Sequence, residues 1–318
     1  MSALATAAVT SPDSPPTPAR PSRRRRPLRR RMATLGWALL FLLPSAVPLT
    51  AFTLAPMVSS AWVSLHDWNL ISPMEWVGLD NYADLLRDPQ TLAVFGHTLL
   101  YILGYLPLVY VGGLGLALAL NRAIKGIGFL RSAYFLPVVT SWVVVALVWQ
   151  WLLAPSGGLV NTLLGAIGLP EPGWWTDPTW AMPSIVLASV WKDLGFVMVI
   201  LLAGLQAIPH EVLEAARVDG ANAWQRFRHM TLPLLSPSTF FVVVISLING
   251  FQVFDQVNVM TGGGPAGASQ VVVGQIYDLT FRYGRAGDAS ALSWLLFAVI
   301  LLITAIQLRG QRRWVTYA

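Results

Sequence analysis

Polar side chains recur at helical spacing within an otherwise apolar stretch near residues 238–259. Asn249, Gln252 and Gln256 are spaced i, i+3 and i+7, which places them on one face of a helix, and Ser246 precedes them by three positions. Hydroxyls and amides supply paired donors and acceptors for hydrogen bonds to an uncharged polar solute. Polar residues in apolar spans are candidates for function, and hydrogen bonds between helices are the alternative role for each of them. The candidate solute-binding residues of this stretch are Ser246, Asn249, Gln252, Asp255 and Gln256.

Charged and aromatic residues mark two further apolar stretches. A lysine at the centre of a membrane helix costs about 2.5–3.5 kcal/mol on insertion scales, so Lys192 needs a partner or water. Lys192 and Asp193 are adjacent, and adjacent residues of a helix do not face each other. We therefore expect separate surroundings for the two, either in a cavity or in an ion pair with another span. The candidates of these stretches are Trp191, Lys192, Asp193, Thr140, Ser141 and Trp142, with membrane packing as the alternative for the tryptophans.

The elements that position these residues follow from composition. Of 318 residues, 55% are hydrophobic and 11% are charged, and the mean hydropathy is +0.59. A soluble domain carries about 25% charged residues, so an ordinary soluble enzyme and a disordered scaffold are excluded. The absence of cysteine from the sequence excludes disulfides, thiolate metal sites and cysteine nucleophiles. The four histidines lack metal-ligand spacing, so we expect neither a metal site nor a catalytic residue.

Six stretches have the apolar length of about 20 residues that a membrane-spanning helix requires. The sequence therefore predicts an all-α polytopic membrane protein. The expected spans are residues 35–58 (with a possible extension to 65), 98–120, 133–153, 182–205, 238–259 and 290–308.

The distribution of basic residues predicts the orientation of these spans. With the N-terminus inside, the inner segments hold 17 of the 21 lysines and arginines, eight of them before residue 33. Basic residues favour the cytoplasmic side, so both termini are expected there. Residues 1–32 are rich in proline, serine and arginine and are expected to be a disordered tail next to anionic lipid headgroups. A nucleic-acid-binding arm is the weaker alternative. Residues 33–318 form the membrane domain.

The predicted inner loop at residues 207–233 has signals for two short helices. Pro209 suits the first turn of a helix, and Gly220 suits a left-handed residue that ends it. Trp224 and Phe227 lie three apart on the helix that follows, and Pro233 marks the turn into the fifth span. Small side chains at Ala215 and Ala216 allow another surface to approach closely.

This loop resembles the EAA motif of permeases of binding-protein-dependent ABC importers. Glu214-Ala215-Ala216 is followed by three residues that end in Asp219, then Gly220, nine residues, and Met230-Thr231-Leu232-Pro233. The family spacing is the same, and its only departure here is Met230 in place of isoleucine. Gly78-Leu79-Asp80-Asn81-Tyr82 and Thr261-Gly262-Gly263-Gly264-Pro265 are similar to the carbohydrate branch. The resemblance covers about residues 35–310.

The resemblance implies a type I ABC importer permease in a bacterial inner membrane, a transport subunit and not an enzyme. It implies a second homologous permease, two copies of a cytoplasmic ATPase that bind ATP and magnesium, and an extracellular sugar-binding protein. The coupling residues would be Glu214, Ala215, Ala216, Asp219, Gly220 and Pro233. The chain has no GxxxxGK[ST] phosphate-binding loop of its own.

Two other classes compete with this interpretation. A secondary transporter driven by an ion gradient would show internal repeats with broken helices, and the two halves of the sequence show no convincing repeat. A membrane-embedded enzyme would need an acid–base pair or a metal site at a membrane face, and the acidic residues lack such spacing. The inner loop at residues 207–233 also has no role in a secondary transporter.

Deletion of residues 2–28 is expected to leave transport largely intact. The tail has almost no large apolar residue to bury, and Arg29, Arg30 and Arg31 still favour the cytoplasmic side. Uptake into cells or vesicles, normalised to the amount of inserted protein, measures the effect. Loss of uptake with normal insertion would show that the tail binds a partner.

Overall fold

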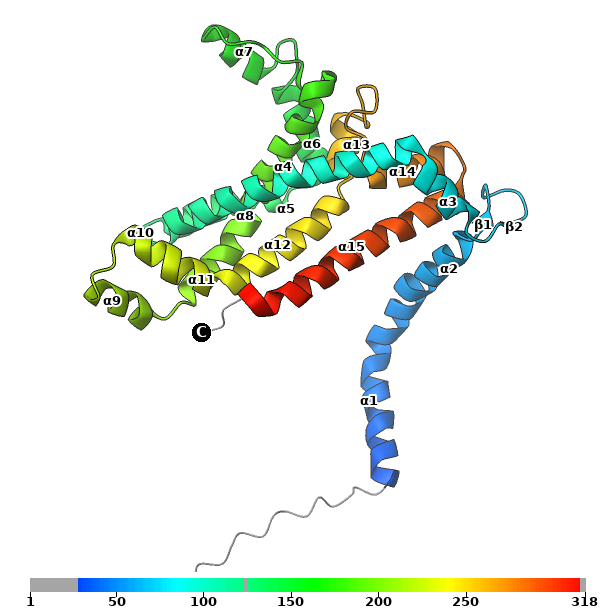
Figure 1. The fold of residues 1–318 in the computed structure, drawn as a ribbon, viewed down its shortest axis with the longest axis horizontal. Helices are drawn as coiled ribbons and strands as arrows, with labels where there is room; N and C mark the ends of the chain where they lie inside the picture. The colour runs from blue at the N-terminus through cyan, green and yellow to red at the C-terminus, as the bar shows by residue number, and fades with distance from the viewer. Residues whose placement is uncertain (1–27, 123–124, 315–318) are drawn as a thin grey trace, which may run out of the picture. The chain divides into compact units, whose positions relative to one another are not determined.

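The computed structural model describes residues 28–122 and 125–314. The chain divides into two compact units, residues 1–57 and 58–318, which are described separately (Figure 1). The first unit contains helix α1 (Leu28–Leu49) and a π-helical stretch, η1 (Thr50–Leu54), and helix α2 (Ala55–Val63) leads into the second unit. Helix α1 begins at Leu28, so residues 28–32 of the expected tail are helical. Leucine and arginine are good helix formers. The remaining predicted tail, residues 1–27, lies outside the described residues.

Four helices of the described chain are long and apolar enough to cross a membrane. They are Leu40–Val63, α4 (Pro89–Leu120), α8 (Pro178–Gln206) and Ala286–Gln311 within α15 (Ala286–Trp314). Two bent pairs reach the same length. The first joins α5 (Ile127–Val139) and α6 (Trp142–Leu152) at 99°, and the second joins residues Ala223–Leu234 to α12 (Ser236–Phe251) at 63°. Counting each bent pair as one span gives six spans, the number that the sequence predicts. Residues 223–234 of the second pair belong mainly to the predicted inner loop, and α12 lies in the predicted fifth span.

The third predicted span is broken instead of straight. Helix α5 ends at Val139, and Thr140 and Ser141 have extended backbones, with ψ of 140° and 139°. Pro137 lies in the last turn of α5, and its carbonyl accepts from the Thr140 N–H at 3.2 Å, which closes the helix end. Thr140 and Ser141 therefore form the joint of the span.

The fifth predicted span also ends earlier than expected. Helix α12 stops at Phe251, and a separate helix, α13 (Asp255–Met260), follows a short turn. Gly250 sits in the last turn, where glycine weakens a helix and lets the backbone approach Ile102 of α4. The prediction of one helical face for Asn249, Gln252 and Gln256 is therefore wrong, because the helix ends between the first and the last of them.

Short elements connect the spans outside the bundle. Strands β1 (His66–Asp67) and β2 (Glu75–Trp76) pair antiparallel, with His66 opposite Trp76. The remaining connecting elements are α3 (Asp80–Arg87), α7 (Leu159–Ala166), η2 (Trp174–Thr176), α14 (Val272–Tyr277) and η4 (Asp278–Arg282).

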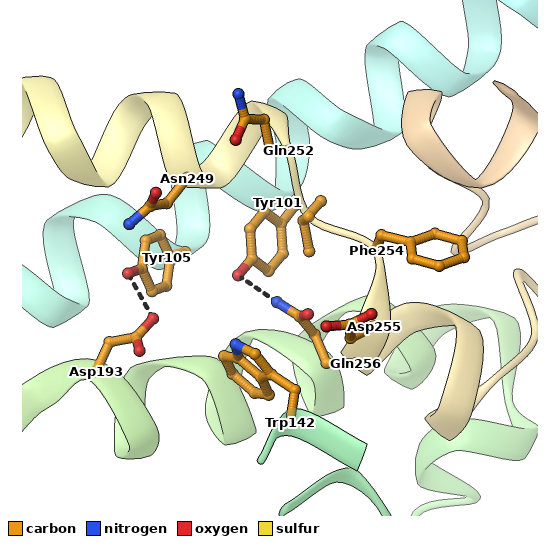
Figure 2. A pocket seen from close by; sticks show the side chains of 10 residues that line it. Tyr101, Tyr105, Trp142, Asp193, Asn249, Gln252, Phe254, Asp255 and Gln256 are labelled. Atoms are coloured by element: carbon orange, nitrogen blue, oxygen red, sulfur yellow. Dashed lines mark hydrogen bonds between the residues drawn. The ribbon is translucent and has the colours of Figure 1, made fainter. Parts of the chain in front are cut away.

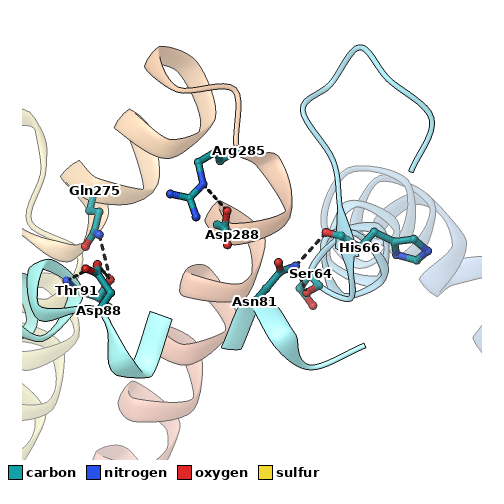
Figure 3. A network of polar contacts seen from close by, with 8 residues as sticks. All are labelled: Ser64, His66, Asn81, Asp88, Thr91, Gln275, Arg285 and Asp288. Carbon is teal, nitrogen blue, oxygen red and sulfur yellow. Dashed lines mark hydrogen bonds and ion pairs between the residues drawn. The ribbon is translucent and has the colours of Figure 1, made fainter. Parts of the chain in front are cut away.

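Polar contacts hold the start of α4 against α14, beside an ion pair at the start of α15 (Figure 3). The Asp88 carboxylate caps α4 by accepting from the backbone N–H groups of Gln90 and Thr91, at 3.2 and 2.9 Å. Burial acts to raise the pKa of Asp88, but hydrogen bonds from Thr91 and Gln90 outweigh it, so the pKa lies below its ordinary value. Gln275 of α14 donates to the Thr91 hydroxyl at 3.1 Å, and Arg285 pairs with Asp288 at 2.7 Å. The cap and these contacts fix where the second span begins.

The core lies where α4, α8, α12 and α15 pack side by side (Figure 1). Val109, Met198, Val242 and Leu292, one from each helix, are fully buried. Helix α5 also packs on α8, and Gly195 of α8 makes this contact possible. A Cβ at Gly195 would meet the backbone carbonyl of Tyr134 in α5. The two helix backbones therefore touch with no side chain between them.

Replacement of Gly195 by alanine is expected to destabilise the protein by about 1–3 kcal/mol, the usual cost of overpacking a tight contact. The matched control is Gly115→Ala in α4, where a Cβ meets nothing within 4 Å and alanine favours a helix. Thermal unfolding of the purified protein in detergent measures both variants. Equal melting temperatures would contradict the close approach at Gly195.

Candidate functional site

A cavity of about 470 Å³ opens among α4, α6, α8 and the turn between α12 and α13 (Figure 2). Its volume lies within the range of about 300–1,000 Å³ that is typical of small-molecule sites. The side chains around it are mainly aromatic rings, amides and carboxylates. The lining consists of Tyr101, Tyr105, Trp142, Asp193, Asn249, Gln252, Val253, Phe254, Asp255 and Gln256.

Two buried tyrosines of α4 form one wall of the cavity. Tyr101 and Tyr105 are one helical turn apart, and their rings stack with centroids 5.4 Å apart. The Tyr105 hydroxyl donates to the Asp193 carboxylate at 2.8 Å, and Gln256 donates to the Tyr101 hydroxyl at 3.4 Å (Figure 2). These bonds join three segments of the chain. They fix the orientation of the polar groups before any solute enters.

A second part of the lining comes from the end of α12 and the start of α13. Asn249, Gln252 and Asp255 are exposed and border the cavity, whereas Gln256 is buried and also donates to Ser189 at 3.4 Å. The break after Phe251 brings this about, because the chain turns there and carries side chains from both helices to the same space. Three amides and a carboxylate thus lie near one another without a shared helical face.

Six of the residues predicted from the sequence meet in this cavity: Trp142, Asp193, Asn249, Gln252, Asp255 and Gln256. The others do not line the cavity. Ser246 is buried in α12, Trp191 packs edge-on against Trp149 at 5.9 Å, and Thr140 and Ser141 form the break of the third span. The contact of any of these residues with a transported solute stays a prediction.

Lys192 is buried but does not line the cavity. Its ammonium group donates to the backbone carbonyl of Val138 at 3.0 Å, whereas the neighbouring Asp193 accepts from Tyr105. The separate surroundings that the sequence predicts for these adjacent residues are confirmed. The expected position of Lys192 in a cavity or in an ion pair is wrong for the described chain, because its partner is a backbone carbonyl.

Sequence reasoning missed Tyr101 and Tyr105. Both lie in a predicted span, in the segment YILGY, and their spacing of four places them on one helical face. Two phenol groups on one face of an apolar span are a signal of the same kind as the amides of the fifth span. The tyrosine hydroxyls are weaker signals because tyrosine also serves as an interface anchor.

The chemistry of this lining suits the binding and orientation of a polar solute. Phenol rings and Trp142 offer flat faces, and the amides and carboxylates offer donors and acceptors for hydroxyl groups. Among the described residues, no three histidine, aspartate or glutamate side chains are grouped so that they could hold a metal ion.

The loop between the fourth and fifth spans forms two helices with a tightly bonded joint. Helix α9 (His210–Val218) follows Pro209, and α10 (Ala223–Arg226) continues through η3 (Phe227–Thr231) and α11 (Leu232–Leu234). Gly220 has φ of +81°. The N–H groups of Gly220 and Ala221 donate to the carbonyls of Arg217 and Ala216, both at 3.0 Å, which is the Schellman pattern of a helix end. The predicted end of the first loop helix is confirmed.

The second loop helix begins with an equally well-bonded cap. Asn222 and Gln225 exchange hydrogen bonds of 2.9 and 2.8 Å between their side chains and backbone N–H groups, a reciprocal pattern that satisfies two backbone donors. The rings of Trp224 and Phe227 lie 5.7 Å apart, as their spacing predicts. The chain therefore changes direction at Gly220 within a few well-bonded residues.

The loop presents small and acidic residues outward. Glu214, Ala215, Asp219 and Gly220 are exposed, whereas Ala216 is buried. The ion pairs of the described chain, Arg282–Asp278 and Arg285–Asp288, do not include Glu214. Pro233 lies in α11, just before the 63° bend into α12, so the predicted turn into the fifth span is confirmed.

Apolar spans around a polar cavity, joined to a paired-helix loop, define a membrane transport subunit. Residues 110–314 match the family described as the binding-protein-dependent transport system inner membrane component, and the chain belongs to this family. It is therefore a multi-pass inner-membrane component of an ABC importer, and the predicted fold class is confirmed.

Relatives and a solved structure agree with this assignment. The chain is 36% identical to the trehalose/maltose transport system permease protein MalF of Thermococcus litoralis, over 90% of this chain and 96% of the relative. It is 35% identical to the probable ABC transporter permease protein YurN of Bacillus subtilis, over 85% and 94%. A chain in the crystal structure of a bacterial alginate ABC transporter, in complex with its alginate pentasaccharide-bound periplasmic protein, matches with a TM-score of 0.80 and 26% identity, over 92% of this chain and 100% of that chain.

Replacement of Asn249 by alanine is expected to weaken transport partially. Its exposed amide borders the cavity, and a hydrogen bond to the solute is worth about 0.5–1.5 kcal/mol, which raises the half-saturating solute concentration about two- to tenfold. Uptake as a function of solute concentration measures the change. Asn258→Ala is the matched control, because Asn258 is exposed but does not line the cavity. Unchanged uptake of every transported solute by Asn249→Ala would remove this residue from the site.

Proposed function

We propose that this chain is one of two permease subunits of an ATP-driven sugar importer and forms half of its translocation pathway. The main observation in support of the proposal is the cavity, which is lined by both aromatic rings and hydrogen-bonding side chains. A sugar presents hydroxyls around its edge and C–H groups on its faces. Amides and carboxylates match the hydroxyls, and the rings of Trp142 and the tyrosines match the faces.

The relatives support a sugar as the solute. The Thermococcus protein is named for trehalose and maltose, and the matched crystal structure concerns alginate, so sugars of different size and charge occur among them. For this chain the cavity lining includes the carboxylates Asp193 and Asp255 and no lysine or arginine. This composition favours a neutral sugar over an acidic one, because two carboxylates repel an anion.

The orientation and the outer partner follow from the charge distribution. Both termini and the loop helices α9–α11 are assigned to the cytoplasmic side, in agreement with the excess of basic residues on that side. The cavity then receives its solute from the opposite side, delivered by an extracellular binding protein. A second, homologous permease subunit supplies the other half of the pathway.

The coupling to ATP is assigned to the paired loop helices. The sequence contains no GxxxxGK[ST] loop, so two copies of a partner ATPase would bind ATP and magnesium. The exposed Glu214, Ala215 and Gly220 form a surface with little bulk, which suits the cleft of such a subunit. Closure of the ATPase pair would push this surface and switch the cavity between the two sides by alternating access.

Purification of the tagged chain from its native membrane tests the proposal. Proteins that copurify are identified by mass spectrometry, and the complex is reconstituted in lipid vesicles with the binding protein. We expect sugar uptake only when ATP is present on the side of the vesicle membrane that exposes the loop helices. Uptake that runs on a proton or sodium gradient without ATP would overturn the proposal in favour of a secondary transporter.

Glu214→Ala and Gly220→Leu are each expected to abolish most sugar uptake while insertion stays normal. Glu214 offers an exposed carboxylate without an ion-pair partner in the described chain, which is available to a basic residue of the ATPase. At Gly220 a side chain meets no atom within 4 Å but the backbone has φ of +81°. Leucine there costs about 1–2 kcal/mol from backbone strain alone and changes the angle between the two loop helices.

Matched variants separate coupling from general damage. Asparagine tolerates a positive φ better than leucine, so Gly220→Asn should keep most of the activity. Glu75→Ala removes an exposed acid of the outer hairpin and should leave uptake unchanged. Pull-down of the ATPase subunit and ATP hydrolysis are measured together with uptake. Normal uptake by both Glu214→Ala and Gly220→Leu would refute the coupling role of this loop.

A further inference from the structure

The break in the third span leaves backbone carbonyl groups that need hydrogen-bond donors. The last carbonyls of any α-helix lack partners within the helix, and the apolar part of a membrane supplies no water to replace them. Helix α5 ends at Val139 and α6 begins at Trp142, with a 99° bend between them. The carbonyls of the last turn of α5 therefore need donors from elsewhere in the protein.

Lys192 of α8 supplies a donor to one of these carbonyl groups. Its side chain reaches the last turn of α5, where the ammonium group donates to the Val138 carbonyl oxygen at 3.0 Å. A positive charge at the C-terminal end of a helix is favourable, because the partial charges of the unpaired carbonyls are negative. The residue is only 5% exposed, so this bond is shielded from water.

The same ammonium group also contacts the other side of the break. It lies 4.9 Å from the centroid of the Trp142 ring, the first residue of α6. A cation over the face of a tryptophan is attracted by the ring, and the attraction is strongest away from water. One charged group therefore touches the end of α5 and the start of α6.

The surroundings of Lys192 argue against a role as counter-ion to a solute. The residue does not line the cavity, and the adjacent Asp193 points to Tyr105 instead. The ion pairs found in the described chain do not include Lys192. Its two contacts, by contrast, lie on either side of the joint formed by Thr140 and Ser141.

We infer that Lys192 is a positioning residue that clasps the two halves of the broken third span and thereby holds the Trp142 ring against the cavity. The clasp consists of the Lys192 ammonium group, the Val138 carbonyl and the Trp142 ring. It goes beyond the proposed transport function, because it concerns the geometry of the span and does not depend on which solute is carried.

Distances between spin labels on the two halves test the clasp. The sequence contains no cysteine, so the double variant Ala133→Cys, Val148→Cys can be labelled without removing any native thiol; both positions are exposed, on α5 and α6. Pulsed electron resonance on the full-length chain in lipid nanodiscs, with its copurifying subunits, gives the distance distribution. With Lys192 present we expect one narrow distance.

Two substitutions of Lys192 give opposite expectations. Lys192→Met fills a similar volume without charge and should lose the single narrow distance in favour of a broad distribution. Lys192→Arg keeps a donor and a cation that stacks on aromatic rings and should retain the narrow distance. An unchanged distribution in Lys192→Met would overturn the inference.

A second label pair separates the clasp from general destabilisation. Leu118→Cys on α4 and Val199→Cys on α8 are exposed and lie away from the break, so their distance should be the same with lysine or methionine at position 192. Broadening of both pairs alike would overturn a specific role at the joint.

The ring side of the clasp gives an independent test if Lys192→Met fails to insert. Trp142→Leu removes the ring and leaves the Val138 bond in place. The distance between positions 133 and 148 should then broaden, and less than in a variant that loses both contacts. A distribution identical to that of the unsubstituted chain would overturn the role of the ring.

Discussion

The requirement that backbone polar groups find partners inside an apolar environment governs this structure. A continuous helix meets the requirement by itself, but the third and fifth spans are interrupted close to the cavity. At these interruptions the backbone carbonyls obtain donors in two ways. After α12 the backbone turns tightly, and the Gln252 N–H donates to the Ile248 and Asn249 carbonyls at 3.2 Å. At the end of α5 and of α13, side chains from other helices donate instead, from Lys192 to Val138 and from Gln150 to Met260.

The interruptions explain why so many polar groups meet in one place. A straight helix directs only every third or fourth residue toward a neighbour. Where α12 ends, consecutive parts of the chain turn toward the same space, so Asn249, Gln252 and Asp255 all border it. The tyrosines of the unbroken α4 face them and are held by Asp193 and Gln256. One part of the lining thus lies on the continuous helix α4, and another part lies where the chain is interrupted between α12 and α13.

The membrane spans and the loop helices could be predicted from the sequence, but the interruptions of the third and fifth spans could not. Apolar length identified the spans, and the residue types at Pro209, Gly220 and Pro233 identified the loop helices, because these signals are local. The ends of α5 and α12 depend on what packs against them. Gly250 meets Ile102, and Val138 meets Lys192, 54 positions further along the chain. A regular period of polar residues therefore indicated a helical face at Asn249, Gln252 and Gln256 that tertiary contacts interrupt.

Helix α12 has one feature with a mechanical consequence. It begins directly after the bend that ends the paired loop helices, and its last turn carries Asn249 into the cavity. Its 16 residues correspond to a rod of about 24 Å at 1.5 Å per residue. The frame beside it is stiff, since α5 and α8 touch backbone to backbone at Gly195. In the proposed coupling, this rod would be the part that carries a displacement of the loop end to the amide end at Asn249.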